Sequence, residues 1–312
     1  SELKILIPEK EPASLYEPIK YILNGGGKRI RPALSMIASG AVGGKTDDGL
    51  YSGIALEILH NFTLVHDDIM DRSPLRRGRE TIHTKWNEAV GILSGDLMVG
   101  HSYKILAKMS AHPRYVNILD VFNKGYIQVC EGQGYDMDFN HSKKITLNDY
   151  LKMIEQKTSF LLITAVLMGA HAGNAEYSQI TSLKDFSYNL GLGFQIQDDL
   201  MDMTADQDKF GKKIGQDILE GKKTYLIIKA KELAKENEDV KLIDKFFEQN
   251  GLTNEYIPKI KAMFEKLNIF SLAQNEVESY FHKAKDSLSE LENNEYVNML
   301  NWITDSLNKR IS

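Results

Sequence analysis

The stretch Leu-Val-His-Asp-Asp-Ile-Met-Asp at residues 64–71 returns as Gln-Ile-Gln-Asp-Asp-Leu-Met-Asp at residues 195–202. Each copy contains Asp-Asp-x-x-Asp and follows apolar sequence with helix-like spacing. On a helix, the first and last aspartates of a copy are four residues apart and share a face, while the middle one lies about 100° round. The two copies therefore predict two helices, each presenting a pair of carboxylates.

Proline placement extends the helical prediction to most of the chain. The seven prolines leave residues 114–257 without any, and an interior proline costs a helix about 3 kcal/mol. Pro32 suits the first turn of a helix that runs through Ala38. We find neither a βαβ alternation nor a hairpin signal such as Asn-Gly between alternating apolar runs. The predicted fold class is all-α.

Composition excludes several classes of protein. The formal charge is −5 and the sequence pI is about 5.9, which argues against nucleic acid as a partner because a binding domain would have a pI above about 9. The single cysteine, Cys130, cannot form an intrachain disulfide and favours a reducing, cytoplasmic location. No linker rich in Gly, Ser or Pro divides the chain, so we expect one domain over residues 1–312.

A transmembrane segment is not expected. The longest stretch without a formal charge runs from residue 158 to residue 175, but only residues 160–170 are densely apolar. A bilayer crossing needs about 20 such residues. We predict a buried core helix instead.

The close carboxylates in each acidic motif suggest a metal site. Three such groups repel one another, and a hard divalent cation such as Mg²⁺ relieves the repulsion by binding a few carboxylates together with water and phosphate oxygens. The alternative is a solvated acidic face or a helix cap. The occurrence of two copies after apolar runs favours the metal.

Two basic segments match an anionic ligand of such a metal. Gly-Gly-Gly-Lys-Arg-Ile-Arg-Pro at residues 25–32 combines a glycine run, three cations and a helix start, which together can bind an anion. It lacks the spacing of a Walker loop. Four arginines follow the first acidic motif, at 72, 76, 77 and 79, with Gly78 as a break. The alternative is a surface turn and local salt bridges.

Taken in order, these motifs resemble the trans-isoprenyl diphosphate synthases, the polyprenyl synthetase family. The matching segments are Gly-Gly-Gly-Lys-Arg-Ile-Arg-Pro at 25–32, Leu-Val-His-Asp-Asp-Ile-Met-Asp at 64–71, Arg-Arg-Gly at 76–78, Lys157-Thr158, Phe194-Gln195-x-x-Asp-Asp and Gly-Lys-Lys-Thr at 221–224. The resemblance implies an antiparallel helix bundle around a deep central cavity, with the two acidic motifs facing each other across its mouth. It also implies a homodimer.

The same resemblance implies the reaction. Family members condense isopentenyl diphosphate with an allylic diphosphate (dimethylallyl, geranyl or farnesyl), release pyrophosphate and lengthen the chain by one C5 unit. Mg²⁺, Arg and Lys would stabilise the leaving diphosphate as the allylic bond ionises. No strongly basic side chain is placed for the final proton removal, so we expect the departing pyrophosphate to accept that proton.

Site residues carry over from the family motifs one by one. Asp67, Asp71 and Asp198 would be the chief Mg²⁺ ligands, with Asp68, Asp199 and Asp202 as further ligands or as residues behind them. Isopentenyl diphosphate would bind Lys28, Arg31, His60 and Arg77. The allylic diphosphate would bind Arg76, Lys157, and Lys222 with Lys212 or Lys213, and Thr158 and Gln195 would lie near the allylic cation. Gln133 and Asp136 resemble a family segment with a supporting role.

One residue of this set has independent support from its spacing. His60 lies seven residues before Asp67, about two helical turns, and therefore on the face that Asp67 and Asp71 share. A lone helical histidine is more often structural, but a place on this stripe favours a phosphate role.

Product length depends, in this family, on residues four and five positions before the first acidic motif. Here these are Thr63 and Phe62. A small residue at the nearer position and an aromatic one at the farther resemble enzymes that make the C20 product, geranylgeranyl diphosphate. The C15 product, farnesyl diphosphate, stays open, and so does a plain core role for Phe62.

Three other classes remain as alternatives. A class I terpene cyclase normally lacks the glycine-rich basic segment and a second Asp-Asp-x-x-Asp, and a non-catalytic regulatory subunit would not need intact aspartates. A calcium-binding loop at residues 206–217 has Phe210 at its fifth position and Asp217 in place of the usual Glu.

Adjacent lysines at 212 and 213 leave open which of them contacts phosphate.

Overall fold

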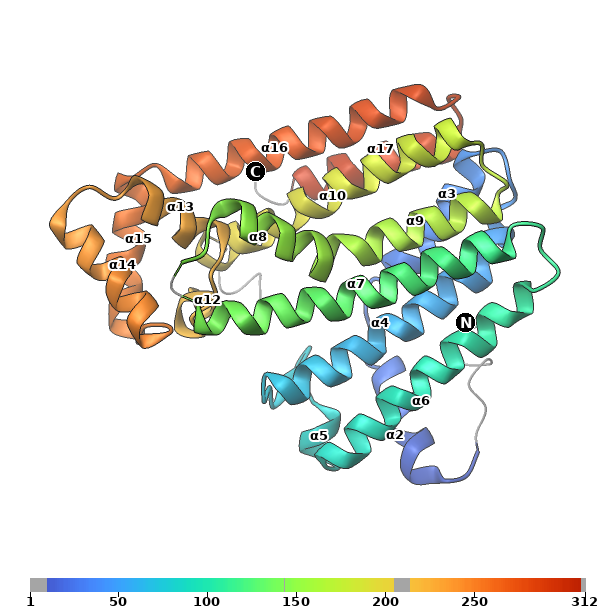
Figure 1. Ribbon diagram of the computed structural model, residues 1–312, viewed down its shortest axis with the longest axis horizontal. Coiled ribbons are helices and arrows are strands. Elements are labelled where there is room, and N and C mark those ends of the chain that lie inside the picture. The colour runs from blue at the N-terminus through green and yellow to red at the C-terminus, as the bar shows by residue number, and fades with distance from the viewer. Residues whose placement is uncertain (1–9, 143, 205–213, 310–312) are drawn as a thin grey trace. The chain divides into compact units, whose positions relative to one another are not determined.

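The computed structural model describes residues 10–142, 144–204 and 214–309. Most of the described residues are helical (Figure 1), which confirms the predicted all-α fold class. The longer helices are α2 (Ala13–Leu23), α3 (Ile30–Ala41), α4 (Leu50–Met70), α6 (Glu88–Leu106), α7 (Tyr115–His141), α8 (Leu147–Ile154), α9 (Phe160–Ala172), α10 (Tyr177–Thr204), α13 (Tyr225–Leu233), α14 (Asn237–Gln249), α15 (Ile257–Lys266), α16 (Ile269–Ser287) and α17 (Glu295–Asn308). The shorter elements are α5 (Ile82–Lys85), α12 (Gln216–Leu219), η1 (Thr46–Gly49), η2 (Ala107–Met109), η3 (Glu155–Ser159), η4 (Asn254–Tyr256) and η5 (Leu288–Glu290).

Two compact units make up the chain, and both are discontinuous in sequence. Unit 1 comprises Ser1–Tyr126, Thr164–Leu183 and Leu291–Val297. Unit 2 comprises Ile127–Ile163, Lys184–Glu290 and Asn298–Ser312. The expectation of a single domain over residues 1–312 stays a prediction.

The core of unit 1 forms around α4, which packs along α6 and against α3 (Figure 1). Apolar residues on all sides of the first half of α4 are buried, among them Ile54, Leu56 and Leu59, each at most 2% exposed. Burial of each large apolar side chain contributes about 1.5–3 kcal/mol. The first acidic motif therefore ends a helix whose position is held firmly by packing.

A close contact between α3 and α9 also belongs to unit 1. A Cβ atom added at Gly169 would lie 2.0 Å from the main-chain oxygen of Ser35, and one at Gly173 would lie 2.6 Å from that of Ser39. Glycine at both positions is what lets the two helices approach so closely. As predicted, α9 is a buried core helix, with Ala165, Val166 and Met168 fully buried.

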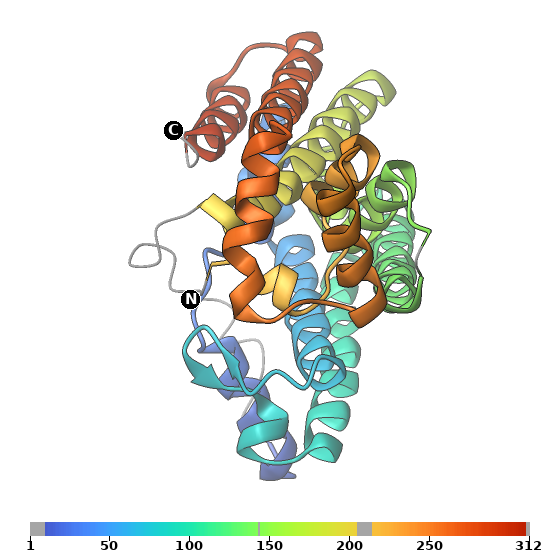
Figure 2. The same ribbon diagram turned by 90° about the vertical axis from the view of Figure 1, so that its left-hand side faces the viewer.

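One small sheet interrupts the helices, which corrects the expectation that no hairpin is present. Among the described residues the sheet consists of β1 (Leu75–Arg76) and β2 (Arg79–Glu80), paired antiparallel (Figure 2). Its two loop residues, Arg77 and Gly78, have φ of 54° and 73°, as in the tight turns that match strand twist. The signal was missed because Arg-Gly replaces Asn-Gly and each strand has only two residues.

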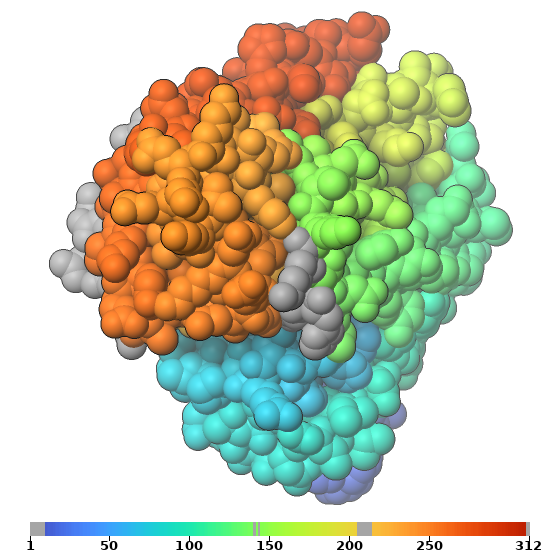
Figure 3. Space-filling view, turned by 60° about the vertical axis from the view of Figure 1, so that its left-hand side comes forward, coloured from blue at the N-terminus to red at the C-terminus, as the bar shows by residue number. Residues whose placement is uncertain are grey.

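The core of unit 2 is formed by α8, α10, α13 and α16 together with residues 127–141 of α7. Phe186, Phe246 and Phe264 are fully buried there, and α13 packs on α8, α14 and α16. Figure 3 shows α14 and α15 (orange) at the surface of this unit. Among the described helices, none combines the length and apolar character that a membrane crossing requires.

Gly169→Ala should destabilise the protein by about 1–3 kcal/mol, because the new methyl group overlaps the main chain of α3 and the packed helices must shift apart. The matched control is Gly134→Ala in α7, where no described atom lies within 4 Å of the added Cβ. This control should gain up to about 1 kcal/mol, the usual advantage of Ala over Gly in a helix. Urea unfolding of the three proteins measures both, and equal stability of the two variants would contradict the close contact.

Candidate active site

The first acidic motif lies at the C-terminal end of α4, where its aspartates have different surroundings. Asp67 is half-buried and Asp71, which caps the helix, is exposed, whereas Asp68 is only 2% exposed. Asp68 accepts hydrogen bonds from Nε of Arg76 at 2.8 and 2.9 Å, one on each oxygen, and pairs with Nη2 at 2.8 Å. The buried carboxylate is therefore neutralised by a forked guanidinium contact.

The chain directly after α4 explains how Arg76 reaches Asp68. Arg72 adopts the left-handed conformation (φ 50°), and the N–H of Ser73 donates to the carbonyl of Asp68 at 2.9 Å, as in a Schellman ending. The chain reverses direction at this ending, so that Arg76, the last residue of β1, lies beside the helix end. Of the other arginines in this group, Arg79 lies over the ring of Tyr21, 4.0 Å from its centroid.

The glycine-rich basic segment and the hairpin contact each other directly. Nη1 of Arg77 donates to the carbonyl of Gly26 at 2.5 Å. Arg29, which is left-handed (φ 50°) at the start of α3, donates to Glu57 of α4 at 2.5 Å and to the carbonyl of Leu23. Glu57 is buried, 4% exposed. The predicted isopentenyl diphosphate residues Arg31, His60 and Arg77 thus belong to one cluster in unit 1, while Lys28 is exposed on the same segment.

Electrostatics in this cluster favour an anion. Burial lowers the pKa of Arg31 to about 10; Glu57 opposes the shift and Arg77 adds to it. Burial, together with Arg31, Arg77, Arg76 and Arg29, lowers the pKa of His60 well below its ordinary value. Among the described residues, neither Nε of Arg31 nor Nδ1 of His60 has a hydrogen-bond partner, although both atoms are buried. Crowded cations with unused nitrogen atoms are suited to a diphosphate.

The predicted chain-length residues also lie on α4. Phe62 is 6% exposed and packs edge-on against His66 and Tyr126, with ring centroids 4.6 and 5.8 Å away. Thr63 is half-buried, and its hydroxyl donates to the carbonyl of His60 at 2.8 Å. The ring of Phe62 is thus packed against neighbouring aromatic rings, five residues before Asp67 on α4.

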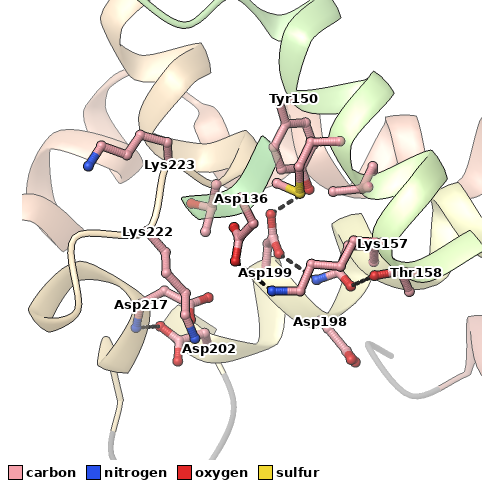
Figure 4. A pocket seen from close by; sticks show the side chains of 14 residues that line it. Asp136, Tyr150, Lys157, Thr158, Asp198, Asp199, Asp202, Asp217, Lys222 and Lys223 are labelled. Atoms are coloured by element: carbon pink, nitrogen blue, oxygen red, sulfur yellow. Dashed lines mark hydrogen bonds and ion pairs between the residues drawn. The ribbon is translucent and has the colours of Figure 1, made fainter. Parts of the chain in front are cut away.

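The second group of predicted residues surrounds a pocket of about 240 Å³ in unit 2 (Figure 4). Lys157 and Thr158 lie in η3, a π-helical turn between α8 and α9. A Cβ atom added at Gly132 would lie 2.4 Å from the main-chain nitrogen of Lys157, and one at Gly191 would lie 2.5 Å from Cβ of Ser159. These glycines leave room for the widened turn, and such turns are frequent at functional sites.

Lys157 is paired across the pocket with an acid of α7. Its Nζ lies 2.5 Å from Oδ2 of Asp136, and both side chains are about a quarter exposed, at 28% and 26%. Figure 4 shows the two side chains directed toward each other. A partly exposed pair of this kind can exchange Asp136 for a phosphate oxygen at modest energetic cost.

The second acidic motif repeats the arrangement of the first. Asp198 and Asp202 are half-buried, whereas the middle residue, Asp199, is only 4% exposed. Asp199 accepts hydrogen bonds from the Tyr150 hydroxyl at 2.6 Å (Figure 4), the Tyr225 main-chain N–H at 3.0 Å and Gln195 Nε2 at 3.1 Å. Burial and then the charge of Asp217 raise the pKa of Asp199 to about 7, while these three hydrogen bonds oppose the shift. Gln195 Oε1 in turn accepts from the Thr158 hydroxyl at 2.8 Å.

Lys222 and Lys223 both line the pocket, but their side chains point in different directions. Burial would lower the pKa of Lys222, but the carboxylates of Asp217, Glu220 and Asp136 raise it above its ordinary value. Nζ of Lys222 lies 3.4 Å from Oδ1 of Asp217 and 2.7 Å from Oε2 of Glu220. Lys223 instead donates to Asn250, and Figure 4 shows it directed away from the other labelled side chains. The main chain of Asp217 donates to Asp202 at 3.2 Å. Lys212 lies outside the described residues.

The charged residues that line the pocket suit a metal ion whose coordination is completed by oxygen atoms of a bound substrate. Five aspartates, at 136, 198, 199, 202 and 217, and the lysines at 157, 222 and 223 line it. Within the described ranges, no three His, Cys, Asp or Glu side chains converge closely enough to hold a metal ion by themselves. Mg²⁺ commonly completes its octahedral shell with water and substrate phosphate oxygens, so Asp198 and Asp202 fit this chemistry.

The structure adds pocket residues that the sequence did not single out. They are Tyr150, Met153 and Ile154, together with Asp217, which the sequence offered only as part of a calcium loop; Lys223 and Thr224 belong to the motif at residues 221–224 but had no assigned role. Tyr150 lies seven residues before Lys157, and this spacing was the available signal. It is obscured because the π-helical turn shifts the register between the two residues.

Comparison with known proteins settles the family. The model of the polyprenyl synthetase family matches residues 12–264. The chain belongs to the polyprenyl synthetase family. It is an enzyme, a prenyltransferase, with the all-α isoprenoid synthase fold.

Individual relatives agree over almost the whole chain. A geranylgeranyl diphosphate synthase of Methanosarcina mazei is 39% identical over 92% of this chain and 86% of its own length. One of Sulfolobus acidocaldarius is 37% identical over 89% of this chain and 84% of its own. The crystal structure of geranylgeranyl pyrophosphate synthetase from Pyrococcus horikoshii superposes with a TM-score of 0.93 at 32% identity, covering 99% of this chain and 94% of that one.

Proposed function

We propose that the enzyme condenses isopentenyl diphosphate with allylic diphosphates, in a reaction that depends on Mg²⁺, and releases geranylgeranyl diphosphate as its main product. The similarity to geranylgeranyl diphosphate synthases over about nine tenths of the chain carries this proposal. The packed ring of Phe62 supports a short-chain product, because it limits the space beyond the first acidic motif.

In the proposed reaction, each group of residues has a separate role. Arg31, His60, Arg77 and Lys28 bind isopentenyl diphosphate, and the buried Arg31 Nε and His60 Nδ1, which lack a partner among the described residues, support this role. Arg76, Lys157 and Lys222 bind the allylic diphosphate, with Lys212 or Lys213 as a further candidate. The carboxylates that would hold Mg²⁺ are Asp67, Asp71, Asp198 and Asp202, whereas Asp68 and Asp199 are occupied by protein donors and support them.

The bound diphosphate leaves as the allylic C–O bond ionises. Mg²⁺, when bound, supplies positive charge to the leaving oxygens. Lys157 and Lys222 place further positive charge beside the leaving oxygens, where negative charge develops in the transition state. Thr158 and Gln195 offer the negative ends of their dipoles to the allylic cation. The double bond of isopentenyl diphosphate forms the new C–C bond to the allylic carbon, and the departing pyrophosphate removes a proton from the resulting cation to restore a double bond.

A homodimer formed through α6 is part of the proposal. Ile92 and Leu93 of this helix are 45% and 53% exposed, adjacent in sequence and on the side that α4 does not cover. Exposed apolar clusters of this kind commonly mark contact surfaces. We also retain the cytoplasmic location, which the single cysteine supports.

Purified enzyme with isopentenyl diphosphate and C5, C10 or C15 allylic diphosphates should form longer prenyl diphosphates, separable by reverse-phase chromatography. A chelator should abolish product formation and Mg²⁺ should restore it. Asp198→Asn should lower kcat by at least about a hundredfold, because a metal ligand contributes several kcal/mol. Asp185→Asn, an exposed position on the same helix, should leave it unchanged. No metal-dependent extension of any allylic partner would overturn the proposed function.

Phe62→Ala should shift the products toward chains longer than C20, because removal of the ring opens space behind the growing chain. The control is Phe270→Ala on α16, which removes a half-buried ring elsewhere and tests whether general loosening alone lengthens products. Mass spectrometry of the dephosphorylated products gives the distribution. An unchanged distribution in Phe62→Ala would remove Phe62 as the floor.

The double variant Ile92→Asp, Leu93→Asp should shift the enzyme from dimer to monomer, because burial of two carboxylates in an apolar contact is strongly unfavourable. Tyr177→Asp is the control, since Tyr177 is a single exposed side chain on α10, 86% exposed. Sedimentation velocity measures the mass of each form. A wild-type monomer at tens of micromolar would refute the proposed interface.

A further inference from the structure

We propose that Tyr150 and Asp199 are positioning residues that fix the direction of a hydrogen-bond chain ending at Thr158, so that the Thr158 hydroxyl presents only lone pairs to the reacting allylic carbon. This inference rests on the proposed function, because the place of the allylic carbon beside Thr158 and Gln195 belongs to that proposal. It adds Tyr150 to the residues on which the reaction depends.

The chain begins at a carboxylate held by three separate helices. Tyr150 comes from α8, Asp199 and Gln195 come from α10, and the main-chain N–H of Tyr225 opens α13. Tyr150 is 1% exposed and Asp199 is 4% exposed. A carboxylate at the start of a helix is also stabilised by the helix dipole. The position of Asp199 is therefore determined by packed elements and not by a mobile loop.

The direction of each hydrogen bond follows from what each group can donate. The N–H of Tyr225 can only donate, and it shares Oδ2 of Asp199 with the hydroxyl of Tyr150. The remaining oxygen, Oδ1, lies 3.1 Å from Nε2 of Gln195. An ionised carboxylate only accepts and an amide NH₂ donates, so Asp199 in its ionised form selects the orientation in which Gln195 turns its NH₂ group toward it.

The orientation of the Gln195 amide decides whether the Thr158 hydroxyl donates a hydrogen bond to it or accepts one from it. With its NH₂ group on Asp199, Gln195 presents Oε1 to Thr158, whose hydroxyl donates to it at 2.8 Å. A threonine hydroxyl has one proton, and this contact uses it. Thr158 lines the pocket, so only the lone pairs of its oxygen remain for a ligand. A neutral oxygen dipole of this kind stabilises a cation without bringing a carboxylate into contact with it.

Burial distinguishes Asp199 from Asp198 and Asp202, which are half-buried. Both of its oxygens have protein donors, as both oxygens of Asp68 have in the first motif. The middle aspartate of each motif is thus engaged in holding other side chains. In the first motif the held side chain is Arg76, and in the second it is Gln195.

Tyr150→Phe tests the inference, because it removes one hydroxyl from a fully buried ring and keeps the ring itself. We expect kcat to fall by about ten- to a hundredfold, the range for a hydrogen bond to a charged group, while KM for both substrates stays within about twofold. Tyr280→Phe is the matched control, a buried tyrosine of α16 in the same unit, and should behave as the wild type. Thermal unfolding verifies that both variants are folded.

A binding measurement separates positioning from a merely structural role. Two unreactive analogues of the allylic diphosphate are compared by calorimetry, one carrying a protonated amine in place of the reacting carbon and one neutral and of the same shape. Wild type should prefer the cationic analogue, and Tyr150→Phe should lose about tenfold of that preference while it binds the neutral analogue equally well. Thr158→Val should lose it too, and Thr158→Ser should retain it.

The outcomes distinguish the inference from the function beneath it. Wild-type enzyme that extends no allylic diphosphate refutes the proposed function. Active wild type with an unchanged kcat in Tyr150→Phe, or an equal loss of affinity for both analogues, overturns the positioning role and leaves the proposed function intact.

Discussion

A carboxylate buried among helices is stable only when protein groups replace the water it has lost, and both acidic motifs are built around this constraint. Asp68 has lost its water almost completely and is bound by the forked guanidinium of Arg76. Asp199 is buried to a similar extent and is bound by a hydroxyl, a helix N–H and an amide. The first and last aspartates of each motif are more accessible, and it is these that fit a shared cation. One repeated sequence pattern thus contains an inner residue that organises the site and outer residues that face the ligand.

Several of the cations follow a related rule, in that a protein contact sets the direction of the side chain. Arg77 contacts the carbonyl of Gly26, Arg29 contacts Glu57, and Lys157 contacts Asp136. Several positions with positive φ, including Arg29 and Arg77, occur in these segments, and residues in this region cost energy that surrounding contacts must offset. Glycines provide the space: Gly132 and Gly191 admit the π-helical turn that carries Lys157 and Thr158. The energy of packing is used here to hold like charges near one another before any anion binds.

Most of the fold could be predicted because helical periodicity is a local property. The proline-free stretch, the apolar run that became α9 and the helix start near Pro32 all correspond to observed elements. The β1–β2 hairpin could not be recognised, because its strands have two residues each and its turn uses Arg77 where Asn is usual. In the site, the paired aspartates and clustered cations follow from motifs, but Tyr150 does not, since the π-helical turn hides its spacing from Lys157. The sequence also did not connect Asp217 with the second motif, because the link is a hydrogen bond from the main-chain N–H of Asp217 to the carboxylate of Asp202.

The sequence by itself determined the helical class, the two carboxylate pairs, and the glycine and arginine segments that identify the family. These depend on residue type and on spacing along one helix, which the backbone geometry of an α-helix sets without reference to the rest of the chain. Only the tertiary structure decided which carboxylates are buried and which way their hydrogen bonds run. Asp199 obtains its donors from Tyr150 and Tyr225, 49 and 26 residues away, and Asp68 obtains Arg76 through a turn that the helix pattern does not contain. Burial and hydrogen-bond direction depend on which distant segments pack together, so the role of each aspartate is a property of the folded molecule and not of the motif.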